Sequence, residues 1–282
     1  MSKLASFVRQ LRAPRTLARK AWADTLVRTG RCNQRTIRVR NFVIRFHPAA
    51  MARSFFVNPN DRATDHAVIT ALLRLGDTCV DVGANIGTTV IPAALAVGPT
   101  GRVWALEAHP RIARFLAENL ALNQLTNVEL RACAADAAPG TITLSDIASD
   151  DMNAIVNGAT RGVTVEAHRL DDIVAGDAPI ALLKIDVEGA ELRVLAGAPR
   201  VLARAAAVYV EVGDAMLRLL GGSAAELVAQ LRAAGFELFR INEARGLSPV
   251  SLADLLERAH SNVLALRDVA AIVGRDGFSL GA

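Results

Sequence analysis

Asp77-Thr78-Cys79-Val80-Asp81-Val82-Gly83-Ala84-Asn85-Ile86-Gly87 is the stretch that decides the fold of this chain. A short β-prone run ends at an acidic residue, a turn of small residues follows, and the apolar residues after the turn have helical spacing. The pattern predicts a strand, a Gly-rich turn and a helix. In an open parallel sheet such a turn lies at the carboxyl ends of the strands, where ligands bind, and the absent side chains of Gly83 and Gly87 would let a ligand approach the backbone.

The spacing within this turn argues against a pyrophosphate ligand. A dinucleotide turn reads G-x-G-x-x-G, because its second glycine makes room for a pyrophosphate at the helix N-terminus. Here Asn85 occupies that position, and the pattern is D-x-G-x-x-x-G. The acidic Asp81 at the end of the strand disfavours a phosphate but suits a cationic or amino-bearing ligand.

Two further strands are expected to bring polar residues to the same edge of the sheet. Residues 102–107 predict a second strand that ends in Glu107. A carboxylate about 20 residues after a Gly-rich turn can accept hydrogen bonds from both hydroxyls of a ribose. Residues 127–133 predict a third strand that leads to Asp136, in a turn where the adenine of a nucleoside would lie. Because strands and helices alternate, the sheet is expected to be parallel and doubly wound.

A second strand-to-turn pattern is dense in carboxylates. The apolar run over residues 180–185 predicts a central strand buried on both faces, and Asp186 and Glu188 follow it. Glu211 lies near the end of the next predicted strand, so all three carboxylates are expected to face one cleft. Lys184 lies within the apolar run, where an unpaired charge is costly, so it is expected to reach the cleft edge or a carboxylate partner.

The rest of the chain predicts one domain over residues 61–282 and a basic N-terminal extension, residues 1–60, formed by a helix and a small hairpin. An insertion hairpin is expected over residues 140–165, and its polar loop, residues 149–153, would contact a second substrate. Seven strands are counted, with helices between most of them. The later elements are expected as strands over 207–212, 236–241 and 262–266, and as helices over 189–204, 223–234 and 250–259.

Composition narrows the class of protein. The chain has 282 residues, of which 52% are apolar and 21% charged, as in an ordinary globular protein. Its net charge of +4 hides an asymmetry, since thirteen basic residues and the single Asp24 lie within residues 1–60. This segment predicts a solvated basic face, with weak contact to a membrane surface or a protein partner as the alternative. Nucleic acid binding is not expected, because aromatic residues are not interleaved with the basic ones.

Membrane segments and disulfides are not expected either. No run of about 18 apolar residues occurs, and arginines interrupt the N-terminus where a signal peptide would be apolar. We therefore expect no transmembrane segment and a cytoplasmic location. The three cysteines, Cys32, Cys79 and Cys133, lie far apart and are expected to be buried thiols.

Five motifs together resemble the FkbM-type methyltransferase family, over about residues 70–245. The motifs are Asp81-Val82-Gly83-Ala84-Asn85-Ile86-Gly87, Leu106-Glu107, Glu118-Asn119-Leu120-Ala121-Leu122-Asn123, Leu170-Asp171-Asp172 and Lys184-Ile185-Asp186-Val187-Glu188-Gly189-Ala190-Glu191. The resemblance implies a Rossmann-like, class I methyltransferase fold with a seven-stranded, mostly parallel sheet whose final strand is antiparallel. It also implies methylation of a hydroxyl oxygen on a sugar, a polyketide or another natural product.

The cofactor that the resemblance implies is S-adenosylmethionine, and this agrees with the residues. That molecule has an adenosine for the acids of the second and third strands, an amino-acid end for the Gly-rich turn, and no pyrophosphate. Its sulfonium cation also suits a cleft lined with carboxylates. The residues expected to bind the cofactor are Asp81, Gly83, Asn85, Gly87, Glu107 and Asp136.

Methyl transfer to an alcohol needs a positioned oxygen, removal of its proton and exclusion of water. Asp186 is the first candidate for the general base, and Glu188 and Glu211 are the others. The same carboxylates are an alternative site for Mg²⁺, which takes oxygen ligands and would polarise the acceptor hydroxyl. His168 is a further candidate base, although a lone histidine beside a strand more often packs. The acceptor is expected to be a small hydroxyl-bearing molecule.

Two other functions stay open at this point. A catalytically silent methyltransferase-like module would bind the cofactor and use its basic N-terminal segment for docking. An NAD(P)-dependent oxidoreductase would share the sheet and Glu107, but it would have a glycine where Asn85 stands.

Overall fold

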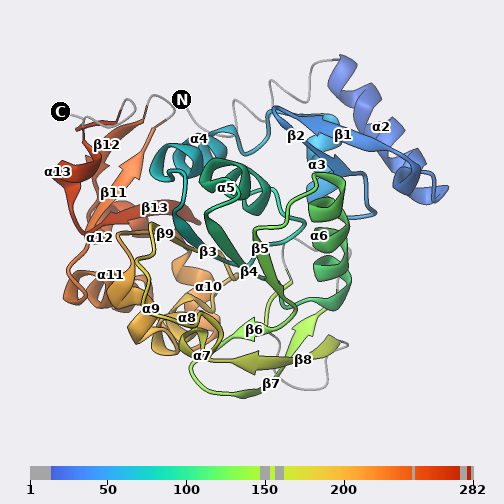
Figure 1. Ribbon diagram of the computed structural model, residues 1–282. Coiled ribbons are helices and arrows are strands. Elements are labelled where there is room, and N and C mark those ends of the chain that lie inside the picture. Colours follow the sequence, from blue (N-terminus) through green and yellow to red (C-terminus); the bar gives the residue numbers. More distant parts are fainter. Residues whose placement is uncertain (1–13, 147–152, 156–161, 243–244, 274–277, 281–282) are drawn as a thin grey trace.

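The computed structural model describes residues 14–146, 153–155, 162–242, 245–273 and 278–280. In this part of the chain a nine-stranded sheet carries helices on both faces, which confirms the predicted α/β fold (Figure 1). The strands, in their order across the sheet, are β14 (Ser279–Leu280), β12 (Gly246–Pro249), β11 (Glu237–Ile241), β13 (Ser261–Leu266), β10 (Ala207–Val212), β9 (Leu182–Ile185), β3 (Thr78–Val82), β4 (Arg102–Leu106) and β5 (Val128–Arg131).

The direction of the strands agrees with the expected topology. The neighbouring strands from β10 to β5 pair in parallel. Strand β13 lies between β10 and β11 and is antiparallel to both. It is the last strand expected from the sequence. Strands β12 and β14 were not expected, because β12 has only four residues, including a glycine and a proline, and β14 has two.

Helices cover both faces of the sheet. The helices of the described residues are α2 (Pro14–Arg28), α3 (Ala50–Val57), α4 (Ala63–Leu72), α5 (Val90–Val97), α6 (Pro110–Leu122), α7 (Leu170–Ile173), α8 (Glu191–Ala196), α9 (Pro199–Arg204), α10 (Asp214–Leu219), α11 (Ala224–Ala233), α12 (Leu252–Leu256) and α13 (Val269–Ile272), with a 3₁₀ turn η1 (Cys32–Gln34). One helix expected over residues 189–204 is two, α8 and α9. Gly197 lies at the break, where a Cβ would stand 2.0 Å from the carbonyl oxygen of Asp136, and Pro199 begins α9.

Alternation along each strand builds two apolar layers, one on each face. Cys79 and Leu182 pack in one layer with residues of α4, α5 and α6. Their neighbours Val80 and Leu183 pack in the other with residues of α8, α9 and α11. Every residue of β9 is buried, which confirms the prediction of a central strand covered on both faces.

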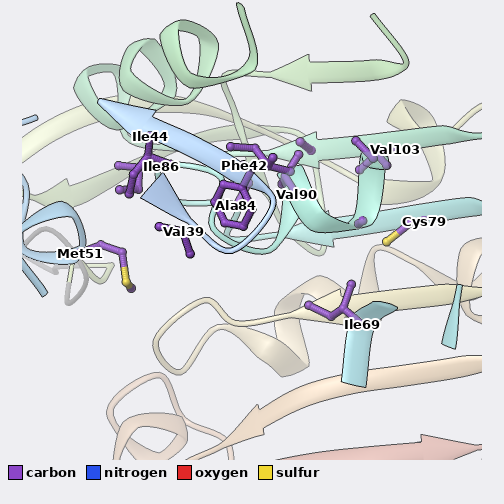
Figure 2. Close-up of a cluster of buried hydrophobic side chains, with 14 of the residues drawn as sticks. Val39, Phe42, Ile44, Met51, Ile69, Cys79, Ala84, Ile86, Val90 and Val103 are labelled. Carbon is purple, nitrogen blue, oxygen red and sulfur yellow. The ribbon is translucent and has the colours of Figure 1, made fainter. Parts of the chain in front are cut away.

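The N-terminal segment joins the first of these layers. The expected hairpin is present as β1 (Thr36–Val39) and β2 (Phe42–Arg45), which pair in antiparallel register. Figure 2 shows Phe42 and Ile44 of this hairpin in one cluster with Val90 and Val103 of the main domain. Helix α2 begins at Pro14, and the earlier part of the expected helix lies outside the described residues. The boundary at residue 60 stays a prediction.

Two asparagines hold the hairpin against the domain, one within α6 and one at its C-terminal end. The side-chain oxygen of Asn119 accepts the backbone N–H of Arg45 at 2.8 Å, and that of Asn123 accepts the backbone N–H of Val43 at 3.0 Å. The amide nitrogen of Asn119 donates to the carbonyl of Ile86 at 2.9 Å. The hairpin is therefore linked, through one side chain, to the Gly-rich turn.

A small second sheet holds the insertion hairpin that the sequence predicts. It consists of β6 (Ala134–Ala135), β7 (Gly140–Ser145) and β8 (Gly162–His168), with β7 and β8 antiparallel. Most of the polar loop expected to contact a substrate lies outside the described residues. The three cysteines are buried and unpaired, as expected.

Among the helices in the described ranges, none has the length and hydropathy needed to cross a membrane.

Candidate active site

A cleft lies at the carboxyl ends of the central strands, and its two ends differ in chemistry. The apolar end is lined by residues of the small sheet and its loop: Ala134, Ala135, Ile142, Leu144 and Ile155. The polar end is lined by Arg62, Asp65, Asp186, Glu188, Glu211 and Asn262. Between the two ends lie residues of the Gly-rich turn, together with Glu107 and Lys184. The cleft can therefore take a molecule with one apolar end and one charged end.

The two glycines of the turn are needed for a reason other than the expected one. Gly83 has φ +84°, and a Cβ there would lie 1.8 Å from the carbonyl oxygen of Asp186. Gly87 has φ +93°, and a Cβ there would lie 2.5 Å from a side-chain carbon of Leu116. Both positions thus require glycine because of backbone conformation and protein packing, whether or not a ligand approaches the turn. Gly83 and Asn85 line the cleft, whereas Gly87 is not among its lining residues.

Glu107 follows β4 and joins the turn to the next segment of chain. Its two carboxylate oxygens accept the backbone N–H groups of Asn85 and His109, each at 2.8 Å. Burial raises the pKa of this carboxyl to about 7. Because each oxygen can accept a second hydrogen bond, Glu107 still offers acceptor capacity to the cleft.

Asp81 was expected to bind the cofactor, but its side chain is not among those that line the cleft. It is buried, and it accepts hydrogen bonds from the hydroxyl of Thr89 at 2.5 Å and from the ammonium of Lys184 at 3.2 Å. Burial alone would lower the pKa of Lys184, but the carboxylates of Asp81 and Asp186 outweigh it and raise that pKa. Lys184 therefore has the carboxylate partner that the sequence predicts.

Asp136, expected to bind the cofactor, has an arginine partner in the structure. Its carboxylate is held by Arg193 of α8, through a 2.8 Å bond to Nε and a second bond to the other oxygen. It also accepts the backbone N–H of Ala137. Asp136 is not among the residues that line the cleft, whereas its neighbours Ala134 and Ala135 are, and its role in binding the cofactor stays a prediction. The pairing of Asp136 with Arg193 could not be predicted from the sequence, because the two residues are 57 positions apart.

The structure brings together the three carboxylates expected to act in catalysis. One oxygen each of Asp186, Glu188 and Glu211 lies within 4.8 Å of the others, and all three residues line the cleft. Asp186 also lies 3.5 Å from the ammonium of Lys184. Burial, with repulsion from Asp186 and Glu188, raises the pKa of Glu211 to about 8, so Glu211 favours its protonated form near neutral pH.

The sequence did not single out a second polar group in the same end of the cleft. Oδ1 of Asp65 accepts the hydroxyl of Tyr209 at 2.7 Å and the amide of Asn262 at 3.2 Å. Arg62 lies 3.6 Å from the other oxygen of Asp65. A usable signal was Tyr209, the single tyrosine of the sequence, in a strand whose other residues apart from Glu211 are apolar.

The candidate base His168 does not change this picture. His168 is 42% exposed, lies 3.3 Å from Glu166 and is not among the residues that line the cleft, so it is not a base for chemistry there. His109 precedes α6 and lines the cleft with a buried ring.

Comparison with known families matches the Methyltransferase FkbM domain to residues 81–238, more than half of the chain. Among curated proteins, the chain is 31% identical over 169 residues to methyltransferase sdnD of Sordaria araneosa, a match that covers 48% of this chain and 65% of that protein. It is 28% identical over 102 residues to an arsenite methyltransferase of Halobacterium salinarum, covering 36% of this chain and 24% of that one. The matches therefore cover less than two thirds of either relative.

Similar solved structures include a TehB-like SAM-dependent methyltransferase from Corynebacterium glutamicum, with a TM-score of 0.45, 13% identity and coverage of 77% of this chain and 94% of that one. A SAM-dependent O-methyltransferase from Thermotoga maritima has a TM-score of 0.41 and 16% identity, with coverage of 72% of this chain and 64% of that one.

Proposed function

The chain belongs to the FkbM methyltransferase family, and we propose that it transfers a methyl group from S-adenosylmethionine to a hydroxyl oxygen of a small acceptor. The acceptor class that we propose is a sugar, a polyketide or another natural product. One observation carries the proposal: the carboxylates of Asp186, Glu188 and Glu211 lie in the same cleft as the Gly-rich turn and Glu107.

The residues of the cleft fit this cofactor. The apolar end, with Ala134 and Ala135, suits an adenine, and the spare acceptor capacity of Glu107 suits the ribose hydroxyls. The carboxylates of the polar end suit a sulfonium and an ammonium. When bound, S-adenosylmethionine supplies a methyl group on a positively charged sulfur, ready for displacement by an oxygen nucleophile. Of the expected cofactor residues, Gly83, Asn85 and Glu107 line the cleft and form the proposed set.

Asp186 is the residue that we propose as general base. The carboxylate of Asp186 lines the cleft and lies within 4.8 Å of those of Glu188 and Glu211, where it can accept a proton from a hydroxyl that enters the cleft. The ammonium of Lys184 lies 3.2 Å from Asp81 and 3.5 Å from Asp186, and it thereby positions the carboxylate of Asp186. A base placed in this way typically adds about 10² to 10⁴ in rate.

Binding of Mg²⁺ is a second candidate role for the same carboxylates, because three oxygens within 4.8 Å of one another can share a cation. However, the ammonium of Lys184 and the proton of Glu211 already offset much of the charge of the cluster. We therefore propose that proton removal needs no metal. Turnover measured in excess EDTA and in added Mg²⁺ should agree, and turnover that depends on Mg²⁺ would replace the base by a metal site.

The test of the base is Asp186→Asn, which keeps the shape of the side chain and removes its charge. With an acceptor found by screening sugars and polyketide alcohols against radiolabelled cofactor, we expect turnover to fall at least about 100-fold. Affinity for S-adenosylhomocysteine should stay within about tenfold. The matched control is Asp177→Asn, on an exposed loop away from the cleft.

Each result has a clear meaning. Normal turnover in Asp186→Asn would refute the base assignment, and a large loss of cofactor affinity would give Asp186 a binding role instead. Cofactor binding by the wild type without turnover on any acceptor would favour a catalytically silent module.

A further inference from the structure

Arg62 is a cationic residue of the cleft that the proposed reaction does not use. It immediately precedes α4 and belongs to a segment outside the part of the chain that matches the family model. Its side chain is 37% exposed and lines the polar end of the cleft. Its nearest charged partner is Asp65, at 3.6 Å, which is longer than a hydrogen bond. In the described part of the chain, its guanidinium makes no hydrogen bond to a protein acceptor.

The backbone at Arg62 is unusual for this residue type. It has φ 55° and ψ 25°, the left-handed region, and its side chain does not cap the helix that follows. Left-handed backbone is unfavourable for a residue with a Cβ, and such conformations persist chiefly where the surrounding structure fixes them, often at functional sites. The conformation is therefore consistent with a side chain held for binding.

Charge balance in the cleft shows what kind of group Arg62 would bind. The Lys and Arg side chains among the described lining residues are Arg62 and Lys184. Lys184 is committed to Asp81 at 3.2 Å and to Asp186 at 3.5 Å. An anionic group that enters this carboxylate-rich end therefore has Arg62 as its available cation. A guanidinium suits a carboxylate especially well, because two of its N–H groups can bind the two oxygens together.

We propose that Arg62 binds the carboxylate of the amino-acid end of the cofactor. The inference rests on the proposed function, since S-adenosylmethionine carries one carboxylate and it stands beside an ammonium. Acids of the polar end would take the ammonium, and Arg62 would take the carboxylate. The cofactor would then be gripped at that end by a residue of the N-terminal part of the chain, outside the Gly-rich turn.

Calorimetric titration with two ligands tests this inference without any turnover. S-adenosylhomocysteine has the carboxylate, and its decarboxylated analogue keeps the amine but lacks that group. We expect the wild type to bind S-adenosylhomocysteine about 10- to 100-fold more tightly than the analogue. Arg62→Gln should remove this preference by weakening only the first ligand. Its affinity for the analogue should be equal or higher, because a positive charge near the amine has been removed.

Two further variants test whether the preference depends on the guanidinium of Arg62. Arg62→Lys keeps the charge but loses the paired N–H geometry, so it should give an intermediate preference. Arg38→Gln makes the same charge change on the exposed side of β1 and should leave both affinities unchanged.

The inference is overturned if the wild type binds both ligands equally, or if Arg62→Gln leaves the preference intact. Equal weakening of both ligands in Arg62→Gln would show a structural role and would also overturn it. If the wild type binds neither ligand, the proposed function itself fails, which is a different result from a wild type that binds S-adenosylhomocysteine without using Arg62.

Discussion

The buried carboxylate of Glu107 has three roles in the structure. It closes the turn at Asn85, fixes the chain at His109, and faces the cleft. Burial raises its pKa to about 7, so part of the population is protonated at neutral pH. A protonated carboxyl has fewer acceptor sites, and the hydroxyls of a ribose would therefore favour the ionised form.

This gives a pH dependence whose sign follows from linkage. Binding to the ionised form lowers the pKa of Glu107 in the complex, so binding releases a proton when the pH is near or below 7. We expect affinity for S-adenosylhomocysteine to fall as the pH is lowered from about 8 to about 6, by up to about tenfold per unit below the pKa of the free protein. Calorimetry across this range measures the dependence.

The control is Glu107→Gln, which cannot ionise and should bind more weakly with a flatter pH profile. If wild type and variant show the same profile, another group is responsible and Glu107 does not contact the ribose.

At the residue scale, the sequence was most informative where a strand ends in an acid. Glu107, Asp186 and Glu211 could be chosen because a β-prone run followed by a carboxylate is visible in the sequence, and all three line the cleft. Asp65 and Asn262 gave no such signal, since they come from a helix and from the last predicted strand. Their approach to the cleft depends on how those elements pack.

The Gly-rich turn is best understood as an element of packing between two strands. Gly83 follows β3 just as Asp186 follows the neighbouring β9, and the backbone of Asp186 fills the place where a side chain of Gly83 would start. The glycine therefore sets the distance between the turn and the proposed base. This role could not be read from the sequence, because it depends on a contact across the sheet.

Substitution of Gly83 by alanine should be far more damaging than the same change at another left-handed glycine. Gly30 has φ +68° and no atom within 4 Å of the place where a Cβ would stand, so Gly30→Ala should cost about 1–2 kcal/mol in unfolding free energy, from the backbone alone. Gly83→Ala adds an overlap with the carbonyl of Asp186, and we expect a loss of more than about 3 kcal/mol or failure to fold. Chemical denaturation of the two variants compares these costs, and equal costs would contradict this account of the turn.

The elements that the sequence missed share a physical reason. Strands β12 and β14 are too short to show alternation, and they form by pairing onto the edge of an existing sheet. The break between α8 and α9 depends on close contact between Gly197 and the chain at Asp136. Strand β9 is also short, but it was predicted correctly because burial on both faces makes the sequence around it apolar except for Lys184.

On the scale of the whole molecule, the N-terminal segment is part of the core and also the source of the basic charge. Its inward residues, such as Phe42 and Ile44, pack with the main domain, while Arg28, Arg31 and Arg38 are exposed. The sequence predicted the hairpin but not its attachment through Asn119 and Asn123. Weak contact of this basic face with a membrane surface or a protein partner stays a prediction.

Directly after this segment, Arg62 and Asp65 contribute to a cleft whose other walls come mostly from the family-matched region. The central claim is therefore about the whole chain: that this combined cleft binds S-adenosylmethionine. Calorimetric titration of the full chain with S-adenosylhomocysteine, with NADH as the comparison and Glu107→Ala as the control, tests it most directly. We expect micromolar binding of S-adenosylhomocysteine that Glu107→Ala abolishes, and no binding of NADH. Absence of S-adenosylhomocysteine binding, or binding of NADH in its place, would contradict it.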